Sequence, residues 1–175
     1  MILDILGGGG SGKTTLKLAL LELGATFRGF ISYTTRPKRS KEEDGIHYHF
    51  VSIEAYLRNN SLMLKREADG WLYGVDQKDL EPHPDKRVVV TTFDVAGIRT
   101  LEEMGREVKV VYLNIPEEER ERRMLLRGDD SETVSRRITI DRQRLQNMEF
   151  NSPMLEIRGG KLDEIVEKVK LFVFG

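Results

Sequence analysis

The chain lacks cysteine, has few prolines and contains no long hydrophobic run, and each absence excludes a class of protein. With no cysteine among its 175 residues, it can form no disulfide, thiolate metal site or cysteine nucleophile. No segment approaches the roughly 20 apolar residues that a membrane span needs. Residues 1–6 run directly into glycines, without the basic and apolar regions of a signal peptide. We therefore expect a cytoplasmic protein with no membrane partner.

An excess of charge of one sign is also missing. The 28 Lys and Arg residues nearly balance the 29 Asp and Glu residues, which leaves a formal net charge of −1. Proteins that bind nucleic acid without sequence specificity usually carry a basic surplus, because neutralising phosphates supplies most of their affinity. We therefore expect no nucleic-acid partner. The 39% of hydrophobic residues and the length of the chain indicate one folded domain.

Apolar runs of strand length alternate with helical patterns, which is typical of an α/β fold with a mostly parallel sheet flanked by helices. The five expected core strands span residues 2–6, 29–33, 86–92, 107–113 and 154–157. The expected helices span residues 13–23, 94–104, 117–127, from Asp129 or Asp130 to about 148, and 161–172. Residues 34–80 break the alternation and predict a small β-rich insertion with a short helix near residues 52–58, so the core comprises residues 1–33 and 81–175.

A glycine-rich loop follows the first expected strand and precedes the first expected helix. It matches the P-loop pattern of two glycines five residues apart followed by Lys and Thr. Glycines let successive backbone N–H groups turn toward a phosphate, and the helix that follows offers its positive end. We expect Lys13 to reach the β- and γ-phosphates and Thr14 to bind Mg²⁺. The expected ATP-binding residues are Gly7, Gly8, Gly9, Gly10, Ser11, Gly12, Lys13, Thr14 and Thr15.

The same glycines also fit the dinucleotide-binding pattern G-x-G-x-x-G through Gly7, Gly9 and Gly12. That pattern requires an acidic residue about 20 positions further on, at the end of the second strand. None occurs in residues 29–35, and the Lys13–Thr14 pair would have no role. The sequence therefore favours a loop that binds the phosphates of ATP over a dehydrogenase site.

A second group of polar residues opens the insertion. Residues 32–39 read S-Y-T-T-R-P-K-R, and residues 44–51 read D-G-I-H-Y-H-F-V. Three cations and a tyrosine hydroxyl in one loop suit a dianionic phosphate, because arginine donates bidentate hydrogen bonds. The alternative is a solvated basic loop without a ligand.

Together with G-W-L-Y-G at residues 70–74 and R-G-D-D-S-E at residues 127–132, these motifs resemble the guanylate kinase family over about residues 2–170. The resemblance implies a single P-loop kinase domain over residues 1–175. It also implies an acceptor-binding insertion at about residues 34–80 and a helical lid at about residues 123–140. Such an enzyme transfers the γ-phosphoryl group of ATP to GMP or dGMP, with Mg²⁺ as its cofactor.

The resemblance also implies roles for individual residues. The acceptor-binding residues are Ser32 at the base, Arg36, Arg39, Tyr48 and Tyr73 at the phosphate, and Asp94. Asp94 either accepts from guanine or serves Mg²⁺ through water beside Thr14. The catalytic residues are Lys13, Arg36, Arg127 and Arg137, with Arg123 in support.

Departures from the family pattern concentrate where the base is read. Leu64 stands where the family usually has a guanine-reading Glu, and Val75 stands where it has Ser or Thr. One Asp and the Gln of the family's third-strand motif are missing from residues 92–97, and the lid is one residue shorter. A leucine cannot accept hydrogen bonds from guanine. Two alternatives therefore remain, a kinase for another nucleotide or a ribose phosphate and a non-catalytic module for phosphorylated ligands. The intact Gly12–Lys13–Thr14 disfavours the module.

Two further groups have ordinary explanations. Eight arginines lie between residues 117 and 144, and we assign Arg120, Arg122, Arg142 and Arg144 to a charged, exposed helix face. We interpret the histidines at residues 47 and 49 as surface or packing residues. They form no metal site, because the remaining histidine, His83, has no convincing ligand spacing to them.

Overall fold

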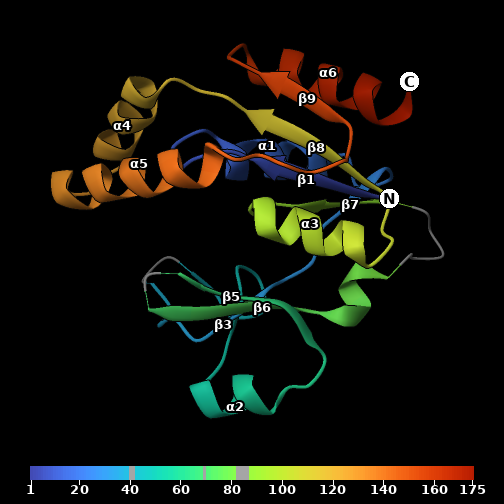
Figure 1. The fold of residues 1–175 in the computed structure, drawn as a ribbon, viewed down its shortest axis with the longest axis vertical. Helices are drawn as coiled ribbons and strands as arrows, with labels where there is room; N and C mark the ends of the chain where they lie inside the picture. Colours follow the sequence, from blue (N-terminus) through green and yellow to red (C-terminus); the bar gives the residue numbers. More distant parts are fainter. Residues whose placement is uncertain (40–41, 69, 82–86) are drawn as a thin grey trace. The chain divides into compact units, whose positions relative to one another are not determined.

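The computed structural model describes residues 1–39, 42–68, 70–81 and 87–175, and the chain forms two compact units (Figure 1). The core unit comprises Met1–Arg28 and Arg87–Gly175, and the insertion unit comprises Gly29–Lys86. The insertion unit is thus wider than the expected residues 34–80. Phe27 and Arg28 are the two residues of their strand that pair with the core sheet, so the chain leaves this sheet directly after Arg28.

A five-stranded, all-parallel sheet forms the centre of the core unit, in the order β2-β7-β1-β8-β9. Its strands are β1 (Ile2–Leu6), β2 (Phe27–Arg28), β7 (Val88–Thr91), β8 (Val108–Leu113) and β9 (Met154–Ile157). All five residues of β1 are buried, as expected of a central strand that is covered on both faces. The expected fold class is confirmed.

Five α-helices belong to this unit (Figure 1). They are α1 (Lys13–Glu22), α3 (Val95–Glu103), α4 (Glu117–Leu126), α5 (Ser131–Leu145) and α6 (Leu162–Phe174). Asp94 and Asp130 start α3 and α5 by accepting the backbone N–H groups of Gly97 and Thr133. Leu16 and Leu20 of α1 pack with Val169 and Val173 of α6 in the main apolar cluster. No helix in the described ranges is long and apolar enough to cross a membrane.

One expected core strand is wrong. Residues 29–33 do not pair in the core sheet. The strand at this place in the sheet is β2, which lies earlier in the chain and pairs with β7, and its Phe27 is buried in the apolar cluster. Tyr33 pairs with Gly74 of the insertion unit as part of β3 (Tyr33–Thr34). The apolar residues Phe30 and Ile31, which favoured a strand, lie in the connection between the two sheets.

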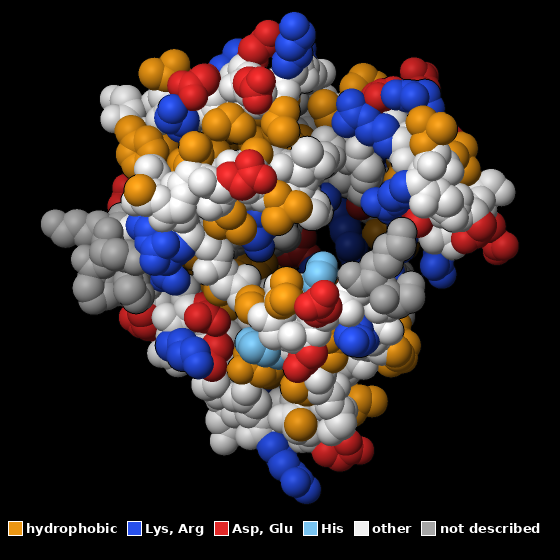
Figure 2. Space-filling model, turned by 180° about the vertical axis from the view of Figure 1, so that it is seen from behind, with side chains coloured by type: hydrophobic (Ala, Val, Ile, Leu, Met, Phe, Trp, Pro, Cys, Tyr) orange, Lys and Arg blue, Asp and Glu red, His pale blue; other side chains and the backbone are white. Residues whose placement is uncertain are grey.

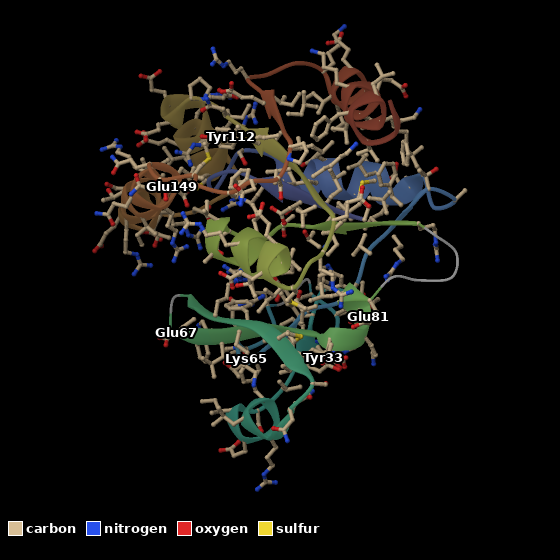
Figure 3. The ribbon with its side chains drawn as sticks, turned by 45° about the vertical axis from the view of Figure 1, so that its right-hand side comes forward. Tyr33, Lys65, Glu67, Glu81, Tyr112 and Glu149 are labelled. Carbon is tan, nitrogen blue, oxygen red and sulfur yellow. The ribbon has the colours of Figure 1, made fainter. Side chains whose placement is uncertain are left out.

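The insertion unit contains a four-stranded sheet in the order β4-β3-β6-β5. Besides β3, its elements are β4 (His49–Phe50), α2 (Ile53–Arg58), β5 (Leu62–Ala68), β6 (Trp71–Asp76) and the 3-10 helix η1 (Gln77–Leu80). In Figure 3, Tyr33 lies on β3, and Lys65 and Glu67 lie on β5. The short helix that the sequence predicts near residues 52–58 is confirmed as α2, with Ser52 as its N-cap.

Candidate active site

The glycine-rich loop joins the end of β1 to the start of α1. Gly12 caps α1 with φ 99°, a left-handed conformation that a side chain would strain, and its carbonyl accepts the first helical hydrogen bond from Leu16 at 3.0 Å. The backbone N–H groups of the first turn have no acceptor within the helix. They therefore present partial positive charge to whatever lies in front of the loop.

Lys13 folds back across this loop. Its Nζ donates to the carbonyl oxygens of Gly7 at 2.6 Å and Gly8 at 2.9 Å, so the ammonium group lies at the loop. The loop lines a pocket of about 470 Å³. The lining residues are Gly8, Gly9, Gly10, Ser11, Gly12, Lys13, Thr14, Thr15, Arg123 and Arg127. All the expected ATP-binding residues except Gly7 thus border one cavity, together with two lid arginines.

The lid arginines share one acidic partner. Arg127 and Arg137 contact the same carboxylate oxygen of Asp129, with nitrogen–oxygen distances of 2.5 and 3.4 Å. Arg123 pairs with Glu119 at 2.7 Å. Figure 2 shows Lys and Arg side chains interspersed with Asp and Glu side chains where α4 and α5 lie, at the right of the view. Each of these arginines therefore has a counter-ion in the protein.

Arg120 does not belong to the exposed helix face to which the sequence assigned it. Its residue exposure is only 4%, and its guanidinium forms an ion pair with Asp141 of α5 at 3.0 Å. The assignment was wrong because Arg120 lies on the face of α4 that packs against the P-loop, close to Gly8. Arg122, Arg142 and Arg144 are exposed as expected.

Asp4 is a buried acid that the sequence analysis did not single out. Its Oδ1 accepts hydrogen bonds from Thr91 Oγ1 at 2.5 Å and from the backbone N–H of Phe93 at 2.7 Å. Within the part of the chain that the structure describes, its Oδ2 has no hydrogen-bond partner. Burial raises the pKa of Asp4 to about 7. A lone acid within I-L-D-I-L is the signal that could have identified it.

Asp94 lies three residues after the end of β7, next to Phe93, whose backbone N–H donates to Asp4. Its Oδ1 accepts the N–H of Gly97 at 3.0 Å, so one carboxylate oxygen caps α3. The charge of Asp94 contributes to raising the pKa of Asp4, whereas Lys13 opposes this effect. The candidate metal or base ligand thus belongs to the same charged neighbourhood as the P-loop lysine.

Arg36 is a half-buried cation of the insertion unit with both aromatic and acidic partners. Its guanidinium lies 5.6 Å from the ring centres of both Tyr48 and Phe50, and its Nη2 donates to Glu42 Oε1 at 2.7 Å. The hydrogen bond from Arg36 is the main reason that the pKa of Glu42 falls to about 2. The arginine is therefore held in place by two rings and one counter-ion.

The other candidate acceptor residues differ in their placement. Tyr48 and Tyr73 meet edge to face, with ring centres 6.0 Å apart, and burial raises the pKa of Tyr48. Arg39 is exposed, and its backbone N–H donates to Glu42, while Ser32 is half-buried. The structure thus brings Arg36, Tyr48 and Tyr73 together and leaves the side chain of Arg39 at the surface.

The turn that carries Tyr48 explains the D-G motif. Asp44 Oδ1 accepts the N–H of Phe50 at 2.8 Å, and Gly45 adopts φ 74°, which favours glycine. His47 Nδ1 accepts the N–H of Glu43, and the His49 ring packs on Tyr33 with ring centres 4.6 Å apart. The described residues contain no cluster of three or more potential metal ligands, and His83 lies outside them.

The two positions that depart from the guanine-reading pattern are structurally distinct. Val75 is only 2% exposed and pairs with Met63 of β5. Leu64 has φ 50° at an irregularity between Met63 and Arg66. A side chain at position 64 therefore leaves the regular alternation of the strand.

A phosphate-binding loop between the first strand and first helix of a parallel sheet, bordered by arginines, defines a P-loop nucleotide-binding protein. The profile of the guanylate kinase family matches residues 2–174, and the chain belongs to this family. The expected nucleoside monophosphate kinase class is thereby confirmed.

Individual relatives agree with this family. The guanylate kinase of Nitratidesulfovibrio vulgaris is 37% identical over 144 residues, covering 79% of this chain and 70% of the relative. That of Helicobacter hepaticus is 32% identical over 154 residues, covering 84% of this chain and 77% of the relative. The crystal structure of guanylate kinase from Anaplasma phagocytophilum superposes with a TM-score of 0.68 at 26% identity and covers 99% of this chain and 84% of that one.

Proposed function

We propose that this chain transfers the γ-phosphoryl group of ATP to GMP, with the P-loop pocket as the donor site. The observation that carries the proposal is the pocket itself, where Lys13, the first turn of α1 and two arginines surround a cavity of about 470 Å³. Positive groups from three directions suit a triphosphate, whose charge increases toward its terminal phosphate. Family membership supplies the acceptor class.

On the donor side, each group has a separate task. The backbone N–H groups of the loop and α1 hold the β-phosphate, and Lys13 exchanges its contacts with Gly7 and Gly8 for phosphate oxygens. Arg127 and Arg137 exchange Asp129 for the transferred group. Because Asp129 holds both guanidinium groups near one carboxylate oxygen, this step exchanges one anionic partner for another.

Mg²⁺ fits the oxygen donors at this site. The ion prefers oxygen ligands and, when bound to nucleotide phosphates, needs only one or two from the protein. Thr14 offers an exposed hydroxyl in the pocket, and Asp94 offers the carboxylate oxygen that does not cap α3. We propose that Thr14 holds Mg²⁺ and that Asp94 serves it through water or accepts from the base. When bound, the ion neutralises charge on the phosphates.

On the acceptor side, Arg36 is proposed to bind the phosphate of GMP, with Tyr48 and Tyr73 donating from their hydroxyl groups and Arg39 approaching from the surface. Ser32 is proposed to contact the base.

An oxygen of the GMP phosphate then attacks the γ-phosphorus of ATP, the bond to the β–γ bridging oxygen breaks, and ADP leaves. The protein forms no covalent bond, so catalysis consists of positioning and charge neutralisation. We propose the cytoplasm as the location, because the substrates are ATP and GMP.

Other acceptors must be tested against this proposal, because Leu64 and Val75 stand where the family has two polar groups that read the base. The protein should be incubated with ATP labelled in its γ-phosphate and with GMP, dGMP, AMP, CMP, UMP, dTMP or ribose phosphates in turn. We expect label in GDP and dGDP well above any other product. Label chiefly in another nucleotide or sugar would replace GMP as acceptor, and label in none would favour a non-catalytic binding module.

A further inference from the structure

The P-loop contains more glycine than its motif requires. The motif fixes glycine at its first and sixth positions, Gly7 and Gly12, and leaves the four between them variable. Here three of these four are also glycine, namely Gly8, Gly9 and Gly10. Since each additional glycine raises the entropy that the loop loses on folding, a packing reason is expected.

Helix α4 supplies that reason. A Cβ atom at Gly8 would lie 1.6 Å from Nη1 of Arg120, and one at Gly10, whose φ is 77°, would lie 2.6 Å from the backbone oxygen of Arg120. At Gly9 the nearest atom would be Met124 Sδ, at 3.2 Å. The outer side of the loop therefore lies directly against Arg120 and the turn of α4 that follows it.

A single carboxylate oxygen joins the loop to both helices. Oδ2 of Asp141, on α5, accepts the backbone N–H of Gly9 at 2.6 Å and Nη1 of Arg120 at 3.0 Å. The side chain of Arg120 is 5% exposed and that of Asp141 is 20% exposed. A buried guanidinium without an acid would be costly, so the pair is required once Arg120 lies there.

Other charged and ionisable groups surround Arg120 without replacing Asp141. Glu117 approaches Nη2 only to 3.9 Å and is itself held by Arg142 at 2.5 Å. Tyr112, labelled in Figure 3 where β8 ends, has its pKa raised by burial and lowered to a lesser extent by Arg120. Asp141 is thus the closest acid to the buried guanidinium among the described residues, and it is the one that also contacts the loop.

We infer that Asp141 is a positioning residue that fixes the P-loop and the two arginine-bearing helices in one geometry for ATP. Arg123 follows Arg120 on α4, Arg127 caps the C-terminal end of α4, and Arg137 precedes Asp141 by one turn of α5. Among the described residues that line the donor pocket, Gly9 is present and Asp141 is not, so the carboxylate holds the loop from outside the pocket. The inference rests on the proposed donor site.

A different consequence of the same contact would be inhibition. The Asp141 carboxylate is an anion that accepts the backbone N–H of Gly9, as a phosphate of ATP could do. If the triphosphate needed this N–H group, the carboxylate would have to move away before ATP could bind. Positioning and inhibition predict opposite effects on ATP affinity when Asp141 is removed, so a binding measurement separates them.

Binding of a non-hydrolysable ATP analogue by calorimetry provides the test, with steady-state kinetics on the same proteins. Asp141→Ala removes both hydrogen bonds but leaves the buried guanidinium of Arg120 without its acid. The double variant Arg120→Met/Asp141→Val, of similar side-chain volume, removes both charges together and should preserve folding. For both variants we expect about tenfold or greater loss of ATP affinity and a lower kcat. If the Gly9–Asp141 hydrogen bond holds the loop only in the geometry that binds ATP, its loss corresponds to at most about 10- to 150-fold in binding. The KM for GMP should change less than about twofold.

Two further variants sharpen the result. Asp141→Asn retains an oxygen for the Gly9 N–H and should recover most of the ATP affinity. Arg142→Met breaks the exposed α4–α5 ion pair with Glu117 without touching the loop, and it should bind ATP like the unmodified protein. Unchanged or tighter ATP binding by the folded double variant would overturn the inference. If the unmodified protein binds ATP but phosphorylates no acceptor, the proposed function fails and the positioning role is still decided by calorimetry.

Discussion

Arg36 and Glu42 form a nearly buried ion pair, 2.7 Å apart, in which the side chains are 11% and 14% exposed. The proposed phosphate-binding arginine therefore has a counter-ion within its own unit. Glu42 also accepts a hydrogen bond from the backbone N–H of Arg39, so one carboxylate contacts two residues of the T-T-R-P-K-R segment. The acceptor phosphate must therefore compete with this carboxylate for Arg36.

Removing Arg36 should therefore affect the acceptor and not the donor. For Arg36→Ala we expect GMP affinity to fall by about 10- to 150-fold, the range for a hydrogen bond to a charged group. ATP affinity should stay within about twofold, since the donor pocket lies in the other unit. Calorimetric titration with each nucleotide measures both. Arg58→Ala, which removes an exposed cation of the same unit, is the control, and equal losses of both nucleotides would mean that the acceptor site is misplaced.

Asp4 should make stability depend on pH. Because its pKa rises from 3.8 to about 7, the folded protein keeps a proton that the unfolded chain releases between these values. The free energy of unfolding should therefore fall as the pH rises through this window, by up to roughly 4 kcal/mol for a shift of about three units. Lys13 and Lys17 lie close enough to oppose this shift, whereas Asp94 adds to it.

Asp4→Asn tests this dependence without removing the hydrogen bonds. Its amide oxygen can still accept from Thr91 and from the backbone of Phe93, but the side chain cannot ionise. Denaturant unfolding between pH 4 and pH 8 should show a flatter profile and a more stable protein at pH 8. A variant that is less stable than the unmodified protein at pH 8 would show that the carboxylate is held ionised by a partner.

Base recognition should improve when the two missing polar groups are restored. Leu64→Glu and Val75→Ser together should raise GMP affinity and the preference for GMP over AMP by about 10- to 150-fold, because a carboxylate and a hydroxyl accept from guanine. Val75 is buried, so the melting temperature must be followed in parallel. A preference of the unmodified protein for GMP above about 10⁴-fold would show that other groups, such as Ser32 and Asp94, already read the base.

The sequence predicted the order of core elements and the donor loop because both depend on local signals. Hydrophobic periodicity located α3 and α5 to within a few residues, and the spacing of Gly12, Lys13 and Thr14 marked the P-loop. The edge strand was misplaced because β2 has only two residues, too few to produce an alternating pattern.

The sequence could not predict contacts between residues that are far apart in the chain. Arg120 and Asp141 are 21 residues apart on separate helices, and each lies among charged neighbours that are exposed. Nothing in either helix distinguishes the buried pair from a solvated Glu/Arg face. Asp4 likewise meets Thr91 from 87 residues away, so only the isolated acid in an apolar strand was visible.

The most direct test of the account is GMP-dependent formation of ADP by the unmodified protein and by Lys13→Ala, measured in a coupled assay with ATP and Mg²⁺. Lys13 lies at the P-loop with its ammonium on the carbonyl oxygens of Gly7 and Gly8, and it is only partly buried, so the variant should fold. We expect the unmodified protein to release ADP only when GMP or dGMP is present, and the variant to lose turnover by several orders of magnitude. Near-full activity in Lys13→Ala, at an unchanged melting temperature, would contradict the assignment of this loop as the site of phosphoryl transfer.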